Sequence, residues 1–394
     1  MPKINRPILS WARKQAELSL EDAVQKLAIH DIKGEPAVHR LEALENGDEE
    51  PSRPMLLKMA KLYRRPLLTF YMSAPPRKGN RGQDFRTLPH DRPIKMDAIV
   101  DTLIRDICAR QSMIRSVLED EEEANPLSFV GSKKTSDGIS TVLMSIRDVL
   151  QFDLDSFYKA SSPSNAFSLL RASVEKQGIF VLLVSNLGSY HTTIEPEIFR
   201  GFAHADNIAP FIIINDRDAK TALSFTLLHE LTHIWLGQTG ISGLNSGNKI
   251  EEFCNDVAGE FLLPEKLLTS LGINSNVSYQ ETKNRISDFA LSHKLSHSMI
   301  AYKLYRSNMI SEQLWHRLSN EFRELWYMHR LEQNKKARET EGGPSYYKVH
   351  RYHLGTSLIN IVQRMMSMGA LTTSKAGKVL GVKAKNVQSL IGAH

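Results

Sequence analysis

The sequence predicts a mostly α-helical protein with one small β-sheet, an α+β domain flanked by helical pieces. Apolar residues recur at helical spacing over most of the chain. Three short runs instead combine β-branched and aromatic residues between Gly, Pro and Asn, at 178–184, 199–204 and 209–215. A chain of 394 residues is too long for one ordinary core, so we expect two or three domains.

The composition narrows the class of protein and the kind of site. A hydrophobic content of 41% with 24% charged residues is typical of a soluble globular protein. We expect no membrane span and no secretory signal, and therefore a cytoplasmic protein. Two cysteines, Cys108 and Cys254, exclude a disulfide framework and a four-cysteine zinc site, so a metal would need His and carboxylate ligands. The net charge of +6 permits nucleic-acid contact without requiring it.

Residues 1–75 are predicted to form a bundle of short amphipathic helices. Ser19 should cap a helix that begins at Leu20, and Asn46-Gly47 should end a helix whose first turn contains Pro36. After Pro66 the sequence becomes rich in Pro, Gly and basic residues, which predicts a linker.

The remaining chain divides by composition. Residues 76–164 are expected to be a linker and a helical region, and residues 165–332 hold the predicted sheet followed by helices. A hydrophilic segment then precedes a last helical domain at 345–394.

The most informative stretch is LLHELTHIW at 227–235. On a helix, His229 and His233 lie one turn apart on the same face and can hold one metal ion. Glu230 is rotated away from that axis, where its carboxylate could serve as a general base. H-E-x-x-H is the pattern of a metalloprotease helix. The helix is predicted to begin after Asp218. The alternative to a metal site is a core helix whose two histidines donate hydrogen bonds to backbone carbonyls.

A third ligand could come from the helix predicted at IEEFCNDVAGEFLLP. Glu251 and Asn255 lie four residues apart at the border of its apolar face, so the amide could accept the ring N–H of a ligating histidine. Glu252 and Asp256 have the same spacing one residue later. Their face points further from the apolar stripe, which favours a solvated pair, but they remain an alternative.

Together, the runs FRGFAH, APFIIIN, SFTLLHELTHIWLG and IEEFCNDVAGEFLLP resemble the ImmA/IrrE family of metallopeptidases over roughly 165–310. The resemblance implies a zincin-like domain in which zinc is held by His229, His233 and Glu251. It further implies Glu230 as general base and Asn255 as the residue that orients a ligand. The implied activity is site-specific cleavage of a regulatory protein, such as a repressor or an antitoxin-like regulator.

The flanks extend the resemblance. The run WARKQAELSLEDAVQKL through YRRPLLTFYMSAPP is similar to an XRE-type helix-turn-helix domain, in which residues 36–47 would enter DNA with His39 and Arg40 near the start. About twelve basic against about ten acidic residues give this segment a weak electrostatic footprint. A helical module that dimerises or docks on a partner is the alternative.

Three questions stay open from the residues alone. LTTSKAGKVLGVKAKNV resembles the tail of such fusions, and either a basic helix-turn-helix or a capping hairpin fits it equally well. His293 and His297 lie four apart without a flanking carboxylate, and His297 or Tyr302 is a candidate for holding an oxyanion. Finally, a DNA-binding regulator or antitoxin whose peptidase fold only senses a partner is the competing function.

Overall fold

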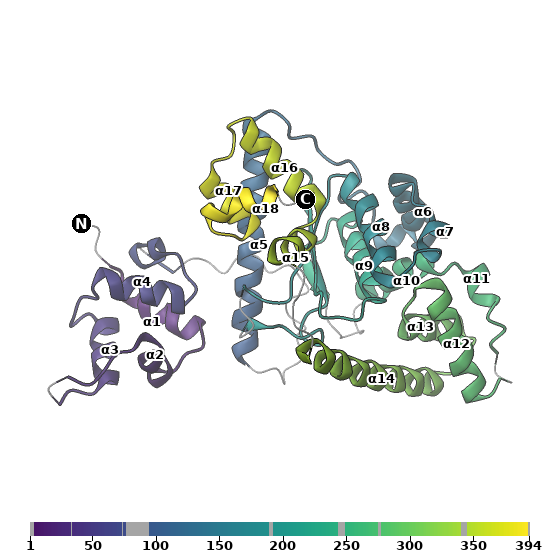
Figure 1. Cartoon of the computed structure of the whole chain (residues 1–394), viewed down its shortest axis with the longest axis horizontal. Helices are drawn as coiled ribbons and strands as arrows, with labels where there is room; N and C mark the ends of the chain where they lie inside the picture. The colour runs from purple at the N-terminus through teal and green to yellow at the C-terminus, as the bar shows by residue number, and fades with distance from the viewer. Residues whose placement is uncertain are drawn as a thin grey trace. The chain divides into compact units, whose positions relative to one another are not determined.

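The computed structural model describes residues 4–32, 34–72, 74–75, 94–188, 192–242, 249–274, 277–339 and 345–392. The chain divides into two compact units, shown in Figure 1. One comprises Met1–Arg81 with Pro89–Asp106, and the other comprises Gly82–Leu88 with Ile107–His394. Within the described residues, no helix is both long and apolar enough to cross a bilayer.

The N-terminal unit is a helical bundle around its own core. It contains α1 (Arg6–Gln15), α2 (Leu20–Leu27), α3 (Ala37–Asn46), α4 (Arg53–Leu62) and the 3-10 helix η1 (Leu67–Tyr71). The predicted helix ends are confirmed, because Ser19 accepts the N–H of Asp22 at 3.0 Å and Gly47 ends α3 with φ of 92°. The linker predicted after Pro66 begins too early, and residues 76–93 of the expected linker region lie outside the described residues. Residues 67–71 form η1, and Phe70 is fully buried in this core because the run is apolar.

The second unit begins with helices that lead into the sheet. These are the end of α5 (Ile94–Asp120), the 3-10 helix η3 (Thr135–Asp137), α6 (Ile139–Leu150), α7 (Leu154–Tyr158) and α8 (Pro163–Lys176). The predicted helical character of this region is confirmed.

A four-stranded sheet follows, with strand order β1-β3-β2-β4. Its strands are β1 (Phe180–Leu183), β2 (Gly201–His204), β3 (Phe211–Ile214) and β4 (Gly240–Ser242). β1 runs parallel to β3, whereas β2 is antiparallel to both β3 and β4. The three predicted strands are confirmed. β4 was not predicted, because three residues carry too little alternation to be distinguished from a loop.

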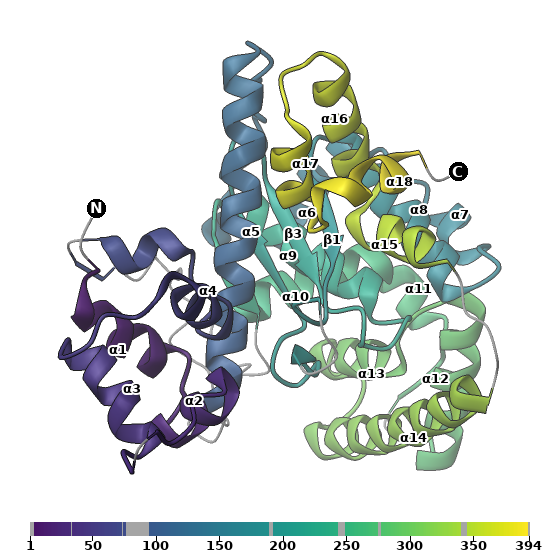
Figure 2. The same cartoon turned by 60° about the vertical axis from the view of Figure 1, so that its left-hand side comes forward.

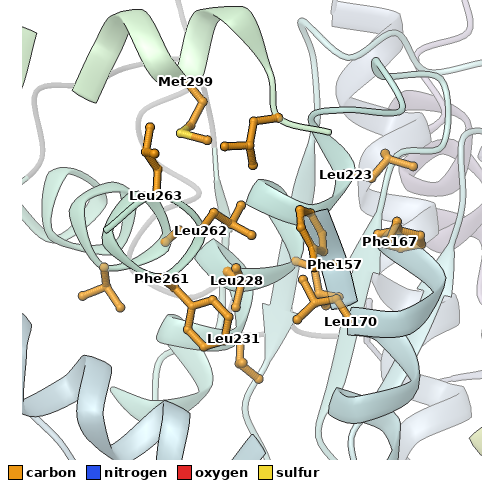
Figure 3. Packing of buried hydrophobic residues seen from close by; sticks show 14 of the residues in the cluster. Phe157, Phe167, Leu170, Leu223, Leu228, Leu231, Phe261, Leu262, Leu263 and Met299 are labelled. Carbon is orange, nitrogen blue, oxygen red and sulfur yellow. The ribbon is translucent and has the colours of Figure 1, made fainter. Parts of the chain in front are cut away.

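Helix α9 (Leu223–Trp235) packs against this sheet and forms the centre of the core. It begins later than predicted, since residues 219–222 form a turn in which Ala222 N–H bonds to Ala219 O at 2.8 Å. Figure 3 shows Leu228 and Leu231 of α9 close to Phe261, within a cluster that also receives side chains from α7, α8 and α13. Helix α9 is apolar around most of its circumference because it is buried on nearly every side.

The remaining elements are all helical. They are α10 (Lys249–Leu262), α11 (Glu265–Thr269), α12 (Tyr279–His293), α13 (His297–Arg306), α14 (Glu312–Glu339), α15 (Tyr346–Leu354), α16 (Thr356–Ser367), α17 (Thr373–Leu380), the 3-10 helix η5 (Ala384–Asn386) and α18 (Val387–Ile391).

The last helices, residues 345–392, form a compact C-terminal module that packs on α8 and β1. A buried ion pair within α8 faces the module: Arg171 Nε lies 2.9 Å from Glu175 Oε1. Arg171 also donates to Tyr352 O at 2.5 Å, and Glu175 accepts the N–H of Thr356 at 3.0 Å. Gly355 is required here, because a Cβ would lie 2.0 Å from Glu175 Oε1. The module therefore packs on β1, the edge strand of the sheet.

Candidate metal centre

Helix α9 brings two histidines together at the heart of the second unit. His229 and His233 lie one turn apart, and their Nε2 atoms are 3.2 Å from each other. Both side chains are almost completely buried, with 5% and 2% of their surface exposed. Two ring nitrogens this close, deep in the protein, require a proton or a cation between them.

Helix α10 supplies the third group. Glu251 Oε2 lies 3.1 Å from His229 Nε2, and Glu251 Oε1 lies 3.3 Å from His233 Nε2. In a tetrahedral zinc site with bonds of roughly 2.0–2.1 Å, neighbouring ligand atoms are about 3.3–3.4 Å apart. The observed separations match that spacing, so these three residues could hold one metal ion.

The electrostatics of the cluster agree with this geometry. Burial would raise the pKa of Glu251, but the hydrogen bonds from His229 and His233 outweigh it and lower the pKa to about 2. Burial also opposes charge on His233, yet its neighbours Cys254 and Glu251 outweigh that effect and raise its pKa well above the ordinary value. The carboxylate is thus ionised, and a positive charge is favoured at its side.

Acceptors behind the histidines orient both rings. Asn255 Oδ1 lies 2.9 Å from His229 Nδ1, and Gln238 Oε1 lies 3.3 Å from His233 Nδ1. When each Nδ1 carries the proton, each Nε2 presents its lone pair to the centre of the cluster. Asn255 was predicted for this position. Gln238 was missed, although its place five residues after His233, just past the helix end, is a usable signal.

Glu230 is completely buried beside the metal cluster. Strand β2 approaches it closely, because a Cβ on Gly201 would lie 2.7 Å from Glu230 Oε1 and 2.8 Å from Thr226 Cγ2. Gly201 was also missed as a site residue. Its signal was a glycine inside a predicted strand, which often marks a close approach.

The alternative pair on α10 faces elsewhere. Asp256 Oδ2 is 2.6 Å from Arg306 Nη2, and Glu252 Oε2 is 3.9 Å from Arg306 Nη1. These carboxylates are engaged on the α13 side of α10, where they pair with Arg306.

The later candidates occupy aromatic surroundings instead of the metal cluster. The ring of His293 stacks on Phe289 at 3.9 Å, and that of His297 lies 5.0 Å from Phe322. Tyr302 contacts Trp315 and lines a cavity of about 300 Å³ that Asn255 also reaches. Nothing in these contacts assigns an oxyanion-binding role to His297 or Tyr302.

In the N-terminal unit, the predicted DNA contacts lie on α3. His39 is exposed, whereas Arg40 donates to His30 O at 2.7 Å. Glu45, which would repel phosphate if exposed, is buried and paired with Arg13 at 2.7 Å. Nine residues, 28–36, connect α2 to α3, whereas a typical helix-turn-helix uses a turn of about three or four.

Comparison with known proteins supports a metallopeptidase-type domain in the second unit. Residues 175–305 match the family model of Peptidase M78, the IrrE N-terminal-like domain. The match supports the ImmA/IrrE family for this part of the chain, and with it a domain of the metallopeptidase type. Neither the curated proteins nor the solved structures contain a match to the chain.

Proposed function

We propose that the protein is a zinc-dependent endopeptidase whose metal is held by His229, His233 and Glu251. The observation that carries the proposal is the convergence of three ligand side chains, whose facing ring nitrogens and carboxylate oxygens are 3.1–3.3 Å apart. Two imidazole nitrogens and one carboxylate oxygen are a donor set typical of catalytic zinc, which keeps a fourth position for water or substrate. The acceptors on Asn255 and Gln238 support the same arrangement.

The proposed mechanism uses Glu230 as the proton carrier. Zinc, when bound, supplies Lewis acidity that activates water and polarises the peptide carbonyl. The Glu230 carboxylate takes a proton from the attacking water and then gives it to the leaving amine. The absence of a side chain on Gly201 lets the β2 backbone lie close to Glu230, which limits the space available to the carboxylate on that side.

A narrow substrate range follows from burial. All three ligands are less than 8% exposed, so a folded protein surface cannot reach the metal position. The substrate we propose is an extended segment of one regulatory protein, a repressor or antitoxin-like regulator. Two free cysteines suit the reducing cytoplasm where such a regulator acts.

The decisive variants separate metal binding from chemistry. Glu230→Gln should keep zinc and lose cleavage, whereas His233→Ala should lose both. New protein N-termini in cells that express the wild type, compared with cells that express Glu230→Gln, would reveal the substrate. Cleavage that survives in Glu230→Gln would exclude the proposed mechanism.

A DNA-binding role for the N-terminal unit is the second candidate. It is favoured by the exposure of His39 on α3 and by the burial of Glu45 in an ion pair with Arg13, which removes one of the two carboxylates of α3 from the surface. The joint variant His39→Ala/Arg40→Ala should weaken binding to an operator duplex while zinc content stays unchanged. If the Glu230→Gln protein retains the full cellular effect, the chain acts as a regulator that binds without cleaving.

A further inference from the structure

The charge of the chain is distributed unevenly. Residues 345–394 contain seven of the 50 Lys and Arg residues and none of the 44 Asp and Glu residues. The preceding 344 residues therefore have a formal net charge of −1. The positive charge that raises the pI to about 9.1 comes from the C-terminal module.

Some of these cations are used inside the fold. Arg364 pairs with Glu123 at 2.5 Å, and Arg351 donates to Leu390 O and Ile391 O at 2.8 and 2.9 Å. Four other side chains are exposed and take no part in the ion pairs found among the described residues. They are Lys375, Lys378, Lys383 and Lys385. Their charge is therefore directed to solvent.

These four lysines belong to a compact helix-turn-helix. Helix α17 ends at Leu380, residues 381–383 make the turn, and η5 with α18 form the second helical segment. The two halves pack closely, because a Cβ on Gly377 would lie 2.8 Å from Val382 O. A three-residue turn with Gly381 at φ of 68° fits the helix-turn-helix pattern, which the connection between α2 and α3 does not.

The second helical segment has one apolar and one polar side. Val387, Leu390 and Ile391 are buried, whereas Gln388 and Ser389 are exposed. The buried side packs on α15, and Figure 2 shows α16, α17 and α18 gathered in one bundle. The exposed side thus presents amide and hydroxyl groups, which bind phosphates and base edges.

We propose that the C-terminal module binds double-stranded DNA, with the four lysines contacting phosphates. The proposal goes beyond the peptidase function and does not depend on zinc. Double-stranded DNA fits better than a membrane surface, because the apolar side chains of α17, at Ala376, Val379 and Leu380, are buried and cannot enter lipid. The major groove of B-DNA admits a helix, whereas that of A-form RNA is too narrow for side chains to read.

The test measures DNA affinity of the full chain against salt concentration. The probe is a fluorescein-labelled duplex of mixed sequence, titrated by anisotropy between low and moderate NaCl. The test variant carries Lys375→Gln, Lys378→Gln, Lys383→Gln and Lys385→Gln. The matched control removes four exposed lysines elsewhere in the second unit, as Lys134→Gln, Lys159→Gln, Lys266→Gln and Lys335→Gln.

Each phosphate contact contributes about 0.9 to the slope of log affinity against log salt, so the test variant should lose about 3 to 4 from that slope. Its affinity at low salt should fall more than about tenfold, while the control, with the same net charge, should change far less. Circular dichroism and zinc content should match the wild type in both variants.

Four results would overturn the proposal. One is an unchanged salt slope in the test variant, and another is an equal loss in the control, which would assign binding to net charge alone. The third is binding to phosphatidylglycerol vesicles or single-stranded RNA, but not to the duplex. The fourth is a loss of duplex binding in His39→Ala/Arg40→Ala but not in the test variant, which would assign DNA to the N-terminal unit. A failure of the peptidase proposal would appear in zinc content and cleavage instead.

Discussion

At the scale of single residues, Asn255 is the side chain that fixes the orientation of His229. Asn255→Ala removes the acceptor at 2.9 Å from Nδ1 and should weaken zinc binding roughly 10- to 100-fold. Competition with a chelator measures this change. Asp256→Ala, on the next residue of the same helix, is the control and should leave zinc affinity unchanged, because Asp256 pairs with Arg306. Equal affinity in the two variants would contradict the assigned role of Asn255.

Gly201 tests the position of Glu230. In Gly201→Ala the new methyl group would meet Glu230 Oε1 and Thr226 Cγ2, so the carboxylate must shift. We expect kcat to fall by roughly 10- to 100-fold while zinc content stays near that of the wild type.

The matched control for Gly201 is Gly259→Ala in α10. A Cβ there meets only Lys303 Cδ at 3.9 Å, an ordinary contact, so kcat should be retained. A normal kcat in Gly201→Ala would show that Glu230 does not depend on the close approach of β2.

The charge state of His233 predicts how zinc affinity depends on pH. Its raised pKa in the metal-free protein means that a proton competes with zinc for the ring nitrogen. Affinity should therefore increase as pH rises toward that pKa, by about tenfold per pH unit for each proton displaced. Zinc titrations between about pH 6 and 8 check the sign. A zinc affinity that does not change with pH would mean that His233 is already deprotonated in the metal-free protein.

At the scale of secondary-structure elements, the Arg171–Glu175 pair joins α8 to the C-terminal module. Glu175→Ala would leave the Arg171 guanidinium buried without its carboxylate and should cost about 3–5 kcal/mol of unfolding free energy. Urea unfolding measures the loss. The comparison variant is Glu119→Ala, whose exposed ion pair with Arg115 should contribute under about 1 kcal/mol. A similar small effect in both variants would show that the module is held by apolar packing alone.

Element boundaries were predictable where a local signal sets them. Ser19 and Gly47 act through their own backbone neighbourhood, so both helix ends follow from the sequence. The start of α9 was misplaced because residues 219–222 carry no strong cap and the structure turns there. β4 depends on pairing with β2, almost forty residues earlier, and such long-range pairing leaves no local pattern.

At the scale of the whole molecule, the site combines a local motif with contacts made only by folding. His229, Glu230 and His233 lie within five residues, so their spacing alone predicts shared chemistry. Residue spacing alone left both Glu251 and Glu252 as candidates for the third metal ligand. The resemblance to the ImmA/IrrE family favoured Glu251. In the structure Glu251 lies beside His233, whereas Glu252 lies near Arg306. Gln238 and Gly201 reach the site through the end of α9 and through β2, which no motif encodes.

The positive charge of the molecule is concentrated in its C-terminal module. A net charge of +6 over the whole chain is weak evidence for nucleic-acid binding. The first 344 residues are nearly neutral, however, and the C-terminal module has no acidic residue. The net charge of each structural module is therefore a better predictor of a nucleic-acid-binding site than the net charge of the whole chain.

The proposed activity depends on one zinc site formed by His229, His233 and Glu251. Elemental analysis of the purified wild type, His233→Ala and Glu251→Ala tests it most directly. We predict about one zinc per wild-type chain, lost or greatly weakened in both variants. A wild-type protein that takes up no metal when zinc is supplied would exclude this zinc site and would leave the buried histidines as a structural cluster.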